Sequence, residues 1–212
     1  GANTTGATNT ALGRNALLAN TTAANNTAVG YASLSANTTG TGLVAVGASA
    51  LDANTTANNN VGIGLNALGG ATTGGDNVAI GTNSLLTNST GASNVSVGTY
   101  ALNANTSSNN TAVGYAALTA NTSGSENNAF GYGALDSNTT AQNNNAFGTL
   151  ALGANTTGTR NTAMGGNTLD ANTTASDNTA VGYTALGANT TGASNTAVGA
   201  SAGDVITTGS NN

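Results

Sequence analysis

Histidine, cysteine, proline and tryptophan are all missing from this chain, and its only basic residues are two arginines. Histidine and cysteine supply most of the proton shuttles, thiolate nucleophiles and zinc ligands of enzymes. Without cysteine the chain also has no disulfide framework, so hydrogen bonds and packing must stabilise it. We therefore expect a protein that is not an enzyme, with no catalytic residues, no metal site and no cofactor.

Charge and long apolar runs are also scarce. Charged residues make up 4% of the 212 residues, and the net charge is −5. Nucleic-acid binding needs a basic surface, so we expect no nucleic-acid partner. No apolar run approaches the ~18 residues of a membrane-spanning helix, so we expect no membrane span. The chain starts at Gly1 without a methionine or a signal-like segment, which suggests a processed part of a longer secreted product.

Asparagine, threonine, alanine and glycine fill most of the chain, and the aliphatic residues among them recur at a fixed spacing. A motif of small residue, aliphatic residue and glycine repeats every 17 residues, with a single step of 16 that falls in residues 105–109. This regularity favours order by repetition over disorder. The glycines of the motif are Gly13, Gly30, Gly47, Gly64, Gly81, Gly98, Gly114, Gly131, Gly148, Gly165, Gly182 and Gly199.

The repeat has the consensus N-T-A-V-G-Y-x-A-L-x-A-N-T-T-G-x-x, whose positions we number from 1 to 17. This unit is too short for helical repeats, which need roughly 33–47 residues. Asparagine, threonine and glycine also disfavour helix. Two short strands, around T-A-V-G and A-L-x-A, and a turn at N-T-T-G fit the length. The sequence therefore predicts an all-β fold, a β-solenoid (parallel β-helix or β-roll) of about twelve 17-residue coils forming a single repeat domain over residues 1–212.

Stacked coils turn each repeat position into a column of side chains. We expect the large apolar residues of positions 4 and 9 to form the core, including a stacked pair of Phe130 and Phe147 at position 4. The asparagines of positions 1 and 12 are expected to form hydrogen-bonded ladders. The small residues of positions 3, 5 and 8 are expected to form an outer face on which two solenoids approach each other.

Association with other copies is the partner that this pattern predicts. Two large apolar side chains per coil make a thin core, and the chain starts mid-coil and ends without a polar cap, which favours head-to-tail stacking. Position 2 is valine in four consecutive coils and threonine or asparagine in all the others. We therefore expect a homo-oligomer, head-to-tail or lateral, and we assign the lateral interface to Val44, Val61, Val78 and Val95.

The Asn-x-Ser/Thr acceptor pattern for N-linked glycans recurs with the coil period. The same residues also suit a turn, so a glycan coat and simple turn chemistry remain alternatives. Position 6 carries Tyr31, Tyr115, Tyr132 and Tyr183, which we expect to face solvent, either as glycan-contacting residues or as surface decoration. The candidate attachment sites are Asn3, Asn20, Asn37, Asn54, Asn88, Asn105, Asn121, Asn138, Asn155, Asn172 and Asn189.

The carboxylates and the threonine columns are weaker candidates for a site. Acidic residues fall at positions 10 and 17, and Asp136 and Asp170 lie two coils apart, roughly 9–10 Å, too far to share one Ca²⁺. We interpret them as solvated turn charges. Regular threonines at positions 13 and 14 could order water and bind ice, but consecutive residues point to opposite faces, so only one column per turn is presented cleanly.

Three segments carry a family resemblance: Asn110 to Leu118, Asn178 to Leu186, and Asn77 to Gly81. They resemble the head repeats of trimeric autotransporter adhesins and the repeats of phage tail-fibre and bacterial surface-fibre proteins. The adhesin heads have a shorter coil and form trimeric left-handed β-rolls. The resemblance implies a fibre on a cell or virion surface, or outside the cell, with an attachment or matrix role and no catalysis.

Together these observations predict a structural subunit of an extracellular or cell-surface filament or fibre shaft, with glycosylation as an open question. The alternative is an adhesin or tail-fibre module that binds a cell-surface receptor or glycan. An ice-binding solenoid is a third, minor alternative.

Overall fold

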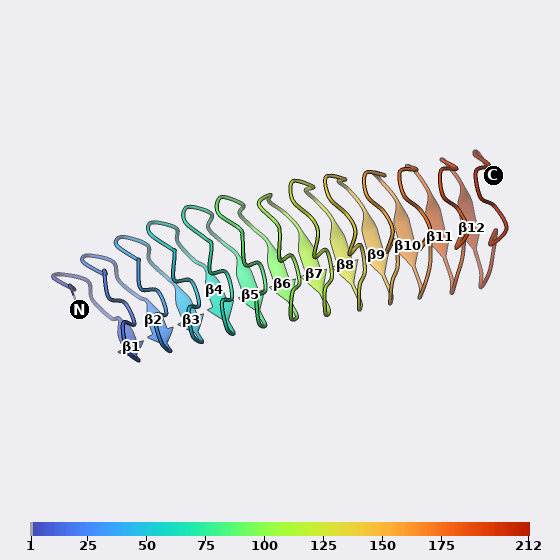
Figure 1. Cartoon of the computed structure of the whole chain (residues 1–212). Coiled ribbons are helices and arrows are strands. Elements are labelled where there is room, and N and C mark those ends of the chain that lie inside the picture. The colour runs from blue at the N-terminus through green and yellow to red at the C-terminus, as the bar shows by residue number, and fades with distance from the viewer. Residues whose placement is uncertain (1) are drawn as a thin grey trace. The chain divides into compact units, whose positions relative to one another are not determined.

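The computed structural model describes residues 2–212, which form strands and turns and contain no helix. The chain divides into two compact units, Gly1–Asn109 and Asn110–Asn212, which we describe separately. Each unit is a parallel β-solenoid in which successive coils are about one repeat of 17 residues apart, with one short strand per coil (Figure 1). The predicted fold class is therefore confirmed.

Every strand has three residues and covers positions 2 to 4 of the repeat. The first unit contains β1 (Thr10–Leu12), β2 (Thr27–Val29), β3 (Val44–Val46), β4 (Val61–Ile63), β5 (Val78–Ile80) and β6 (Val95–Val97). The second unit contains β7 (Thr111–Val113), β8 (Asn128–Phe130), β9 (Asn145–Phe147), β10 (Thr162–Met164), β11 (Thr179–Val181) and β12 (Thr196–Val198).

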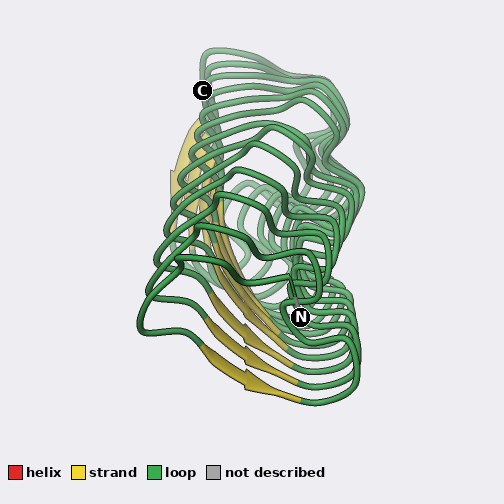
Figure 2. Cartoon of the chain, turned by 90° about the vertical axis from the view of Figure 1, so that its left-hand side faces the viewer, coloured by secondary structure: helices red, strands yellow, loops and turns green. Residues whose placement is uncertain are grey.

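Within each unit the strands pair in parallel and in the register of the repeat. Ala28 of β2 lies beside Ala45 of β3, and Ala163 of β10 lies beside Ala180 of β11. The strands occupy one side of the coils, and turns form the remainder (Figure 2). Equivalent positions therefore stack as columns, as the repeat predicts.

The expectation that position 4 belongs to the core is wrong. Side chains alternate between the two faces of a strand, so a three-residue strand turns its middle residue one way and its outer residues the other. The middle residue, position 3, is the buried one, as at Ala28 and Ala45. Position 4 faces outward, and Ile63 and Met164 are 37% and 45% exposed. Phe130 and Phe147 do stack, with ring centroids 4.8 Å apart, but on the outer surface.

The core lies inside the coil and is built on position 9. This leucine column is buried, as predicted, and the small residues of positions 3 and 8 pack beside it. Those small residues therefore do not form an outer face, which corrects the expected arrangement for lateral contact. The buried leucines are Leu17, Leu34, Leu51, Leu68, Leu85, Leu102, Leu118, Leu135, Leu152, Leu169 and Leu186.

The second expected strand, around A-L-x-A, is a turn instead. The leucine at position 9 adopts a left-handed backbone conformation, with φ of 50° at Leu34 and 50° at Leu186. This conformation costs a bulky residue roughly 1–2 kcal/mol. The sharp turn directs the leucine into the core, and the N–H of Leu34 still donates to the carbonyl of Ala50 in the next coil, at 3.0 Å. Burial and this hydrogen bond hold the strained turn in place.

The glycine at position 5 is required by the stacking of the backbone. At Gly30 φ is 135°, and a Cβ atom there would lie 2.5 Å from the carbonyl oxygen of Gly47 in the next coil. Real Cβ atoms do not approach that closely, so no side chain fits between the coils. Gly199, in the last coil, has the same positive φ, but a Cβ there would meet only the Cβ of Ala202, at 3.8 Å.

Candidate functional site

The first polar feature is a ladder of position-12 asparagines inside each unit. Asn37 Nδ2 donates to Asn20 Oδ1 at 3.1 Å and to the carbonyl of Gly40 at 3.0 Å. In the next coil Asn54 Nδ2 donates to Asn37 Oδ1, also at 3.1 Å. These side chains are fully buried, with 0–1% exposure. The predicted asparagine ladder is confirmed, and it stabilises the stack by linking each coil to the next in a low-dielectric interior.

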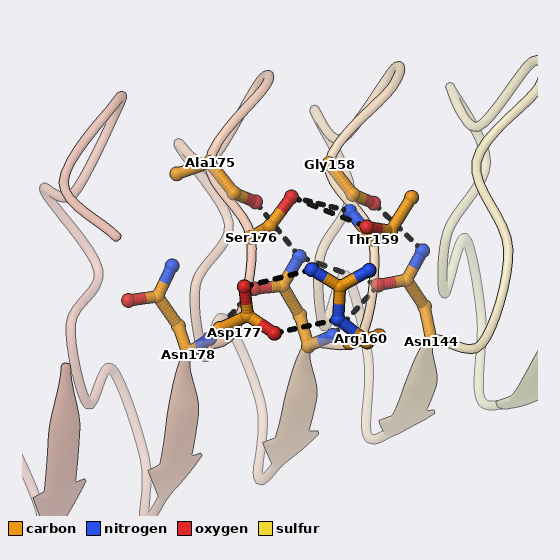
Figure 3. A network of polar contacts seen from close by, with 9 residues as sticks. Asn144, Gly158, Thr159, Arg160, Ala175, Ser176, Asp177 and Asn178 are labelled. Carbon is orange, nitrogen blue, oxygen red and sulfur yellow. Dashed lines mark hydrogen bonds and ion pairs between the residues drawn. The ribbon is translucent and has the colours of Figure 1, made fainter. Parts of the chain in front are cut away.

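The asparagines of position 1 form a second buried column that bonds to the backbone. Asn144 Nδ2 donates to the carbonyl of Gly158 at 2.8 Å, while Asn144 Oδ1 accepts the N–H of Asn161 at 2.9 Å (Figure 3). The N–H of Asn178 donates in turn to Asn161 Oδ1 at 3.0 Å. Each side chain therefore joins a turn to the strand of the next coil. The buried asparagines of position 1 therefore stabilise the contact between successive coils.

The position-12 ladder is broken at one point in the first unit, where Ala71 takes the place of asparagine. Asn54 Oδ1, one coil earlier, is the acceptor that the missing amide would use. It is a buried side-chain oxygen that makes no hydrogen bond within residues 2–212. The break therefore leaves an unpaired polar atom in the core, which costs roughly 1–3 kcal/mol.

The glycan acceptor pattern coincides with this buried ladder. An N-linked glycan requires an accessible amide nitrogen, whereas ten of the eleven candidate asparagines are 0–1% exposed. The fold therefore does not offer these ten to a glycosyltransferase, because the turn chemistry of N-T-T places them inside the coil. Asn3 is exposed. The ten buried candidates are Asn20, Asn37, Asn54, Asn88, Asn105, Asn121, Asn138, Asn155, Asn172 and Asn189.

The tyrosines of position 6 lie on the surface, as predicted. Tyr31 and Tyr183 are 54% and 62% exposed. Tyr115 and Tyr132, from adjacent coils, stack with ring centroids 5.6 Å apart and 9° between their planes. This stacked pair presents an exposed aromatic surface on a chain rich in asparagine and threonine.

The two threonine columns differ in their availability. At position 13 the hydroxyl is used inside the molecule: Thr38 Oγ1 donates to the carbonyl of Thr55 in the next coil at 3.0 Å. At position 14, Thr39 and Thr56 are exposed. Position 14 is the more exposed of the two columns, and ice binding through it remains a prediction that a thermal-hysteresis measurement tests.

An apolar surface lies on the outside of β3–β6, where positions 2 and 4 are all β-branched aliphatic residues. We call it the outer valine face. It contains the predicted interface row of Val44, Val61, Val78 and Val95, together with Val46, Ile63, Ile80 and Val97 from position 4. Val95 and Ile80 are each 38% exposed. This face, rather than one of small residues, is the apolar surface available for lateral contact in the first unit.

The charged groups are dispersed over the turns. Arg160 and Asp177, from adjacent coils, form a bidentate pair with Nε–Oδ1 and Nη2–Oδ2 distances of 2.7 and 2.9 Å (Figure 3). The hydrogen bond from Arg160 lowers the pKa of Asp177. Partial burial instead raises the pKa of Asp52, Asp136 and Asp170, all at position 10. Over residues 2–212 no three acidic side chains gather into a set that could hold a metal ion.

A hollow of about 220 Å³ opens at the first coil of the first unit. Its walls are the interior columns themselves: alanines of positions 3 and 8, Leu17 of position 9, and asparagines of positions 1 and 12. It is therefore lined by the same columns that stack from coil to coil in the rest of the unit.

Comparisons with protein-family models, with curated proteins and with solved structures found no match for this chain. No helix long and apolar enough to cross a membrane occurs in the described part of the chain.

Proposed function

We propose that this chain is a structural protein, the shaft of an extracellular or cell-surface fibre. The observation that carries the proposal is that each coil offers its neighbour the same columns in the same register: leucine, two asparagine ladders and a parallel strand. A coil that packs on another coil of the same kind can be repeated to build a long fibre. The buried asparagine side chains bond from coil to coil, which suits a stacking role.

Further coils or copies would extend the stack by the same contacts. In a solenoid, each repeat contacts only its neighbours, so stability grows as coils are added. An inner strand such as β3 pairs in register with a strand on each side, and a further coil would pair in the same way.

Receptor or glycan binding is the second candidate function, and the exposed tyrosine column favours it. Aromatic rings with solvated hydroxyl groups can pack against sugar rings, and the stacked Tyr115 and Tyr132 provide two adjacent faces. The resemblance of the repeats to adhesin heads and tail-fibre repeats supports the same function. In this case the shaft would be short and its surface would select a partner.

Electron microscopy of the native assembly distinguishes the two functions. Long unbranched filaments support the shaft, whereas discrete short spikes support the binding module. A glycan-binding screen of the purified chain, compared with a Tyr115→Ala/Tyr132→Ala variant, tests the second function directly. Binding that the variant loses would favour the module, and no binding by the unaltered chain would count against it.

A further inference from the structure

We propose that the outer valine face of β3–β6 packs against the same face of a second copy, so that shafts pair side by side. This inference rests on the proposed shaft function, and it names the surface and the partner. The observation behind it is that positions 2 and 4 of four successive strands carry eight β-branched aliphatic residues and no polar one. Ile63, Ile80 and Val95 are 37–38% exposed and the other five are half-buried, so the face presents a small apolar surface of a kind that mediates contacts when it repeats.

The partner is a second copy because the face is neutral and complementary to itself. All eight side chains are valine or isoleucine, while the acidic residues that make the chain negative lie at positions 10 and 17 of the turns. Two identical chains of net charge −5 can therefore meet through a face that itself carries no charged residue. Identical rows of β-branched side chains interdigitate when two sheets pack ~10 Å apart. A two-fold interface uses one such patch twice.

The size of the face sets the strength of the contact. Four strands ~4.8 Å apart and two rows roughly 7 Å apart give a surface of about 20 by 12 Å once the side chains are included. That is well below the ~800 Å² per partner of a stable interface. The contact between two isolated chains is therefore weak and reversible, and it becomes strong when it repeats along a fibre.

The second unit shows that the valines are not needed for folding. At the same outward position its strands carry threonine or asparagine, and Asn128 Nδ2 there donates to Asn145 Oδ1 at 2.9 Å. Threonine has nearly the shape of valine and a similar preference for strands. Replacing the valines of the first unit by threonine therefore gives each strand a residue that the same backbone already accommodates elsewhere in the chain.

The test uses the full chain with Val44→Thr, Val61→Thr, Val78→Thr and Val95→Thr together. The matched control removes four exposed large apolar side chains from position 6: Tyr31→Thr, Leu65→Thr, Tyr115→Thr and Tyr183→Thr. Sedimentation equilibrium from about 10 µM to about 1 mM measures association, a range that covers weak complexes. Circular dichroism melts verify that all three proteins are folded.

We expect the unaltered chain to approach the mass of a dimer as its concentration rises. The valine variant should associate more weakly, with a dissociation constant about tenfold or more higher, and the control should leave the constant unchanged. A monomer throughout the range, or equal association by the valine variant, would overturn the inference. If only the control weakens association, the tyrosine column is the interface and the inference is also wrong.

Electron microscopy of the same samples separates this inference from the proposed function. Filaments that are paired in the unaltered chain and single in the valine variant support both. Filaments that are single in both proteins would support the shaft function and overturn the pairing. Dimers without any end-to-end filaments would support the pairing and overturn the shaft function.

Discussion

Restoring the broken asparagine ladder should make the protein more stable. In an Ala71→Asn variant the new amide would occupy the same place as the asparagines of neighbouring coils. There, the distances from Nδ2 to the next Oδ1 are 3.1 Å for both Asn37 and Asn54. The new Nδ2 would donate to Asn54 Oδ1, the buried oxygen that has no partner among residues 2–212. It would also donate to the carbonyl of Gly74, which accepts from Asn60 Nδ2 at 2.8 Å.

The size of the effect follows from these contacts. Pairing a buried unsatisfied acceptor recovers roughly 1–3 kcal/mol, and the second hydrogen bond adds about 1 kcal/mol. Ordering the new side chain costs up to ~1 kcal/mol. The free energy of unfolding should therefore rise by about 2 kcal/mol. For a chain of this size that corresponds to an increase of roughly 4–8 °C in Tm.

Urea unfolding and thermal melts of the full chain measure this change, and hydrogen exchange of the coil around residue 71 shows whether it is local. The reciprocal variant, Asn138→Ala, creates the same break in the second unit, where Asn138 Nδ2 now bonds Asn121 Oδ1 at 2.9 Å. It should lower stability by a similar or larger amount. If Ala71→Asn folds but is neutral or destabilising, while Asn138→Ala costs stability, the reasoning that the ladder is continuous through this coil is refuted.

Two further predictions test the backbone stacking and the titrating groups. Gly131→Ala should cost more than about 4 kcal/mol, because a Cβ there would lie 2.5 Å from the carbonyl oxygen of Gly148. Gly199→Ala, with a similar φ but no such clash, should cost only about 1–3 kcal/mol, so equal losses in melts of the two variants would contradict the stacking argument. Burial raises the folded-state pKa of Asp52, Asp136 and Asp170 above the ordinary aspartate value of 3.8, so the folded state takes up protons before the unfolded state as the pH falls. Stability should therefore increase as the pH falls through these raised pKa values toward 3.8, before the Arg160–Asp177 pair is lost at lower pH as Asp177 is protonated. Urea melts across this pH range should show the increase, and the Asp52→Asn/Asp136→Asn/Asp170→Asn variant should not.

The repeat alone predicts the period, the parallel stacking, the leucine column and the asparagine ladders. These follow from the spacing, because stacking makes every repeated residue a column whatever its side chain does. Which face each column occupies does not follow from the period. The sequence favours an interior place for position 4 because that residue is always large and apolar. The strand, however, has only three residues, and its middle one, such as Ala28, points inward.

The turn around position 9 explains why that error arises. A leucine with φ near 50° is rare in proteins, so A-L-x-A reads as a strand in the sequence. The left-handed turn instead brings Leu34 and its equivalents into the interior and leaves space there only for small residues at positions 3 and 8. The buried state of the glycan acceptor asparagines has the same origin, because the turn that follows places position 12 inside. The N-T-T pattern itself is compatible with an asparagine inside the coil or on its surface.

The central claim is that the coil is a layer of a longer assembly, and cryo-electron microscopy of the assembled native protein tests it most directly. Filaments longer than one chain are predicted, with a layer spacing of ~4.8 Å and density for the leucine and asparagine columns inside each coil. Discrete particles of single-chain length, or filaments whose layers run without that spacing, would contradict it.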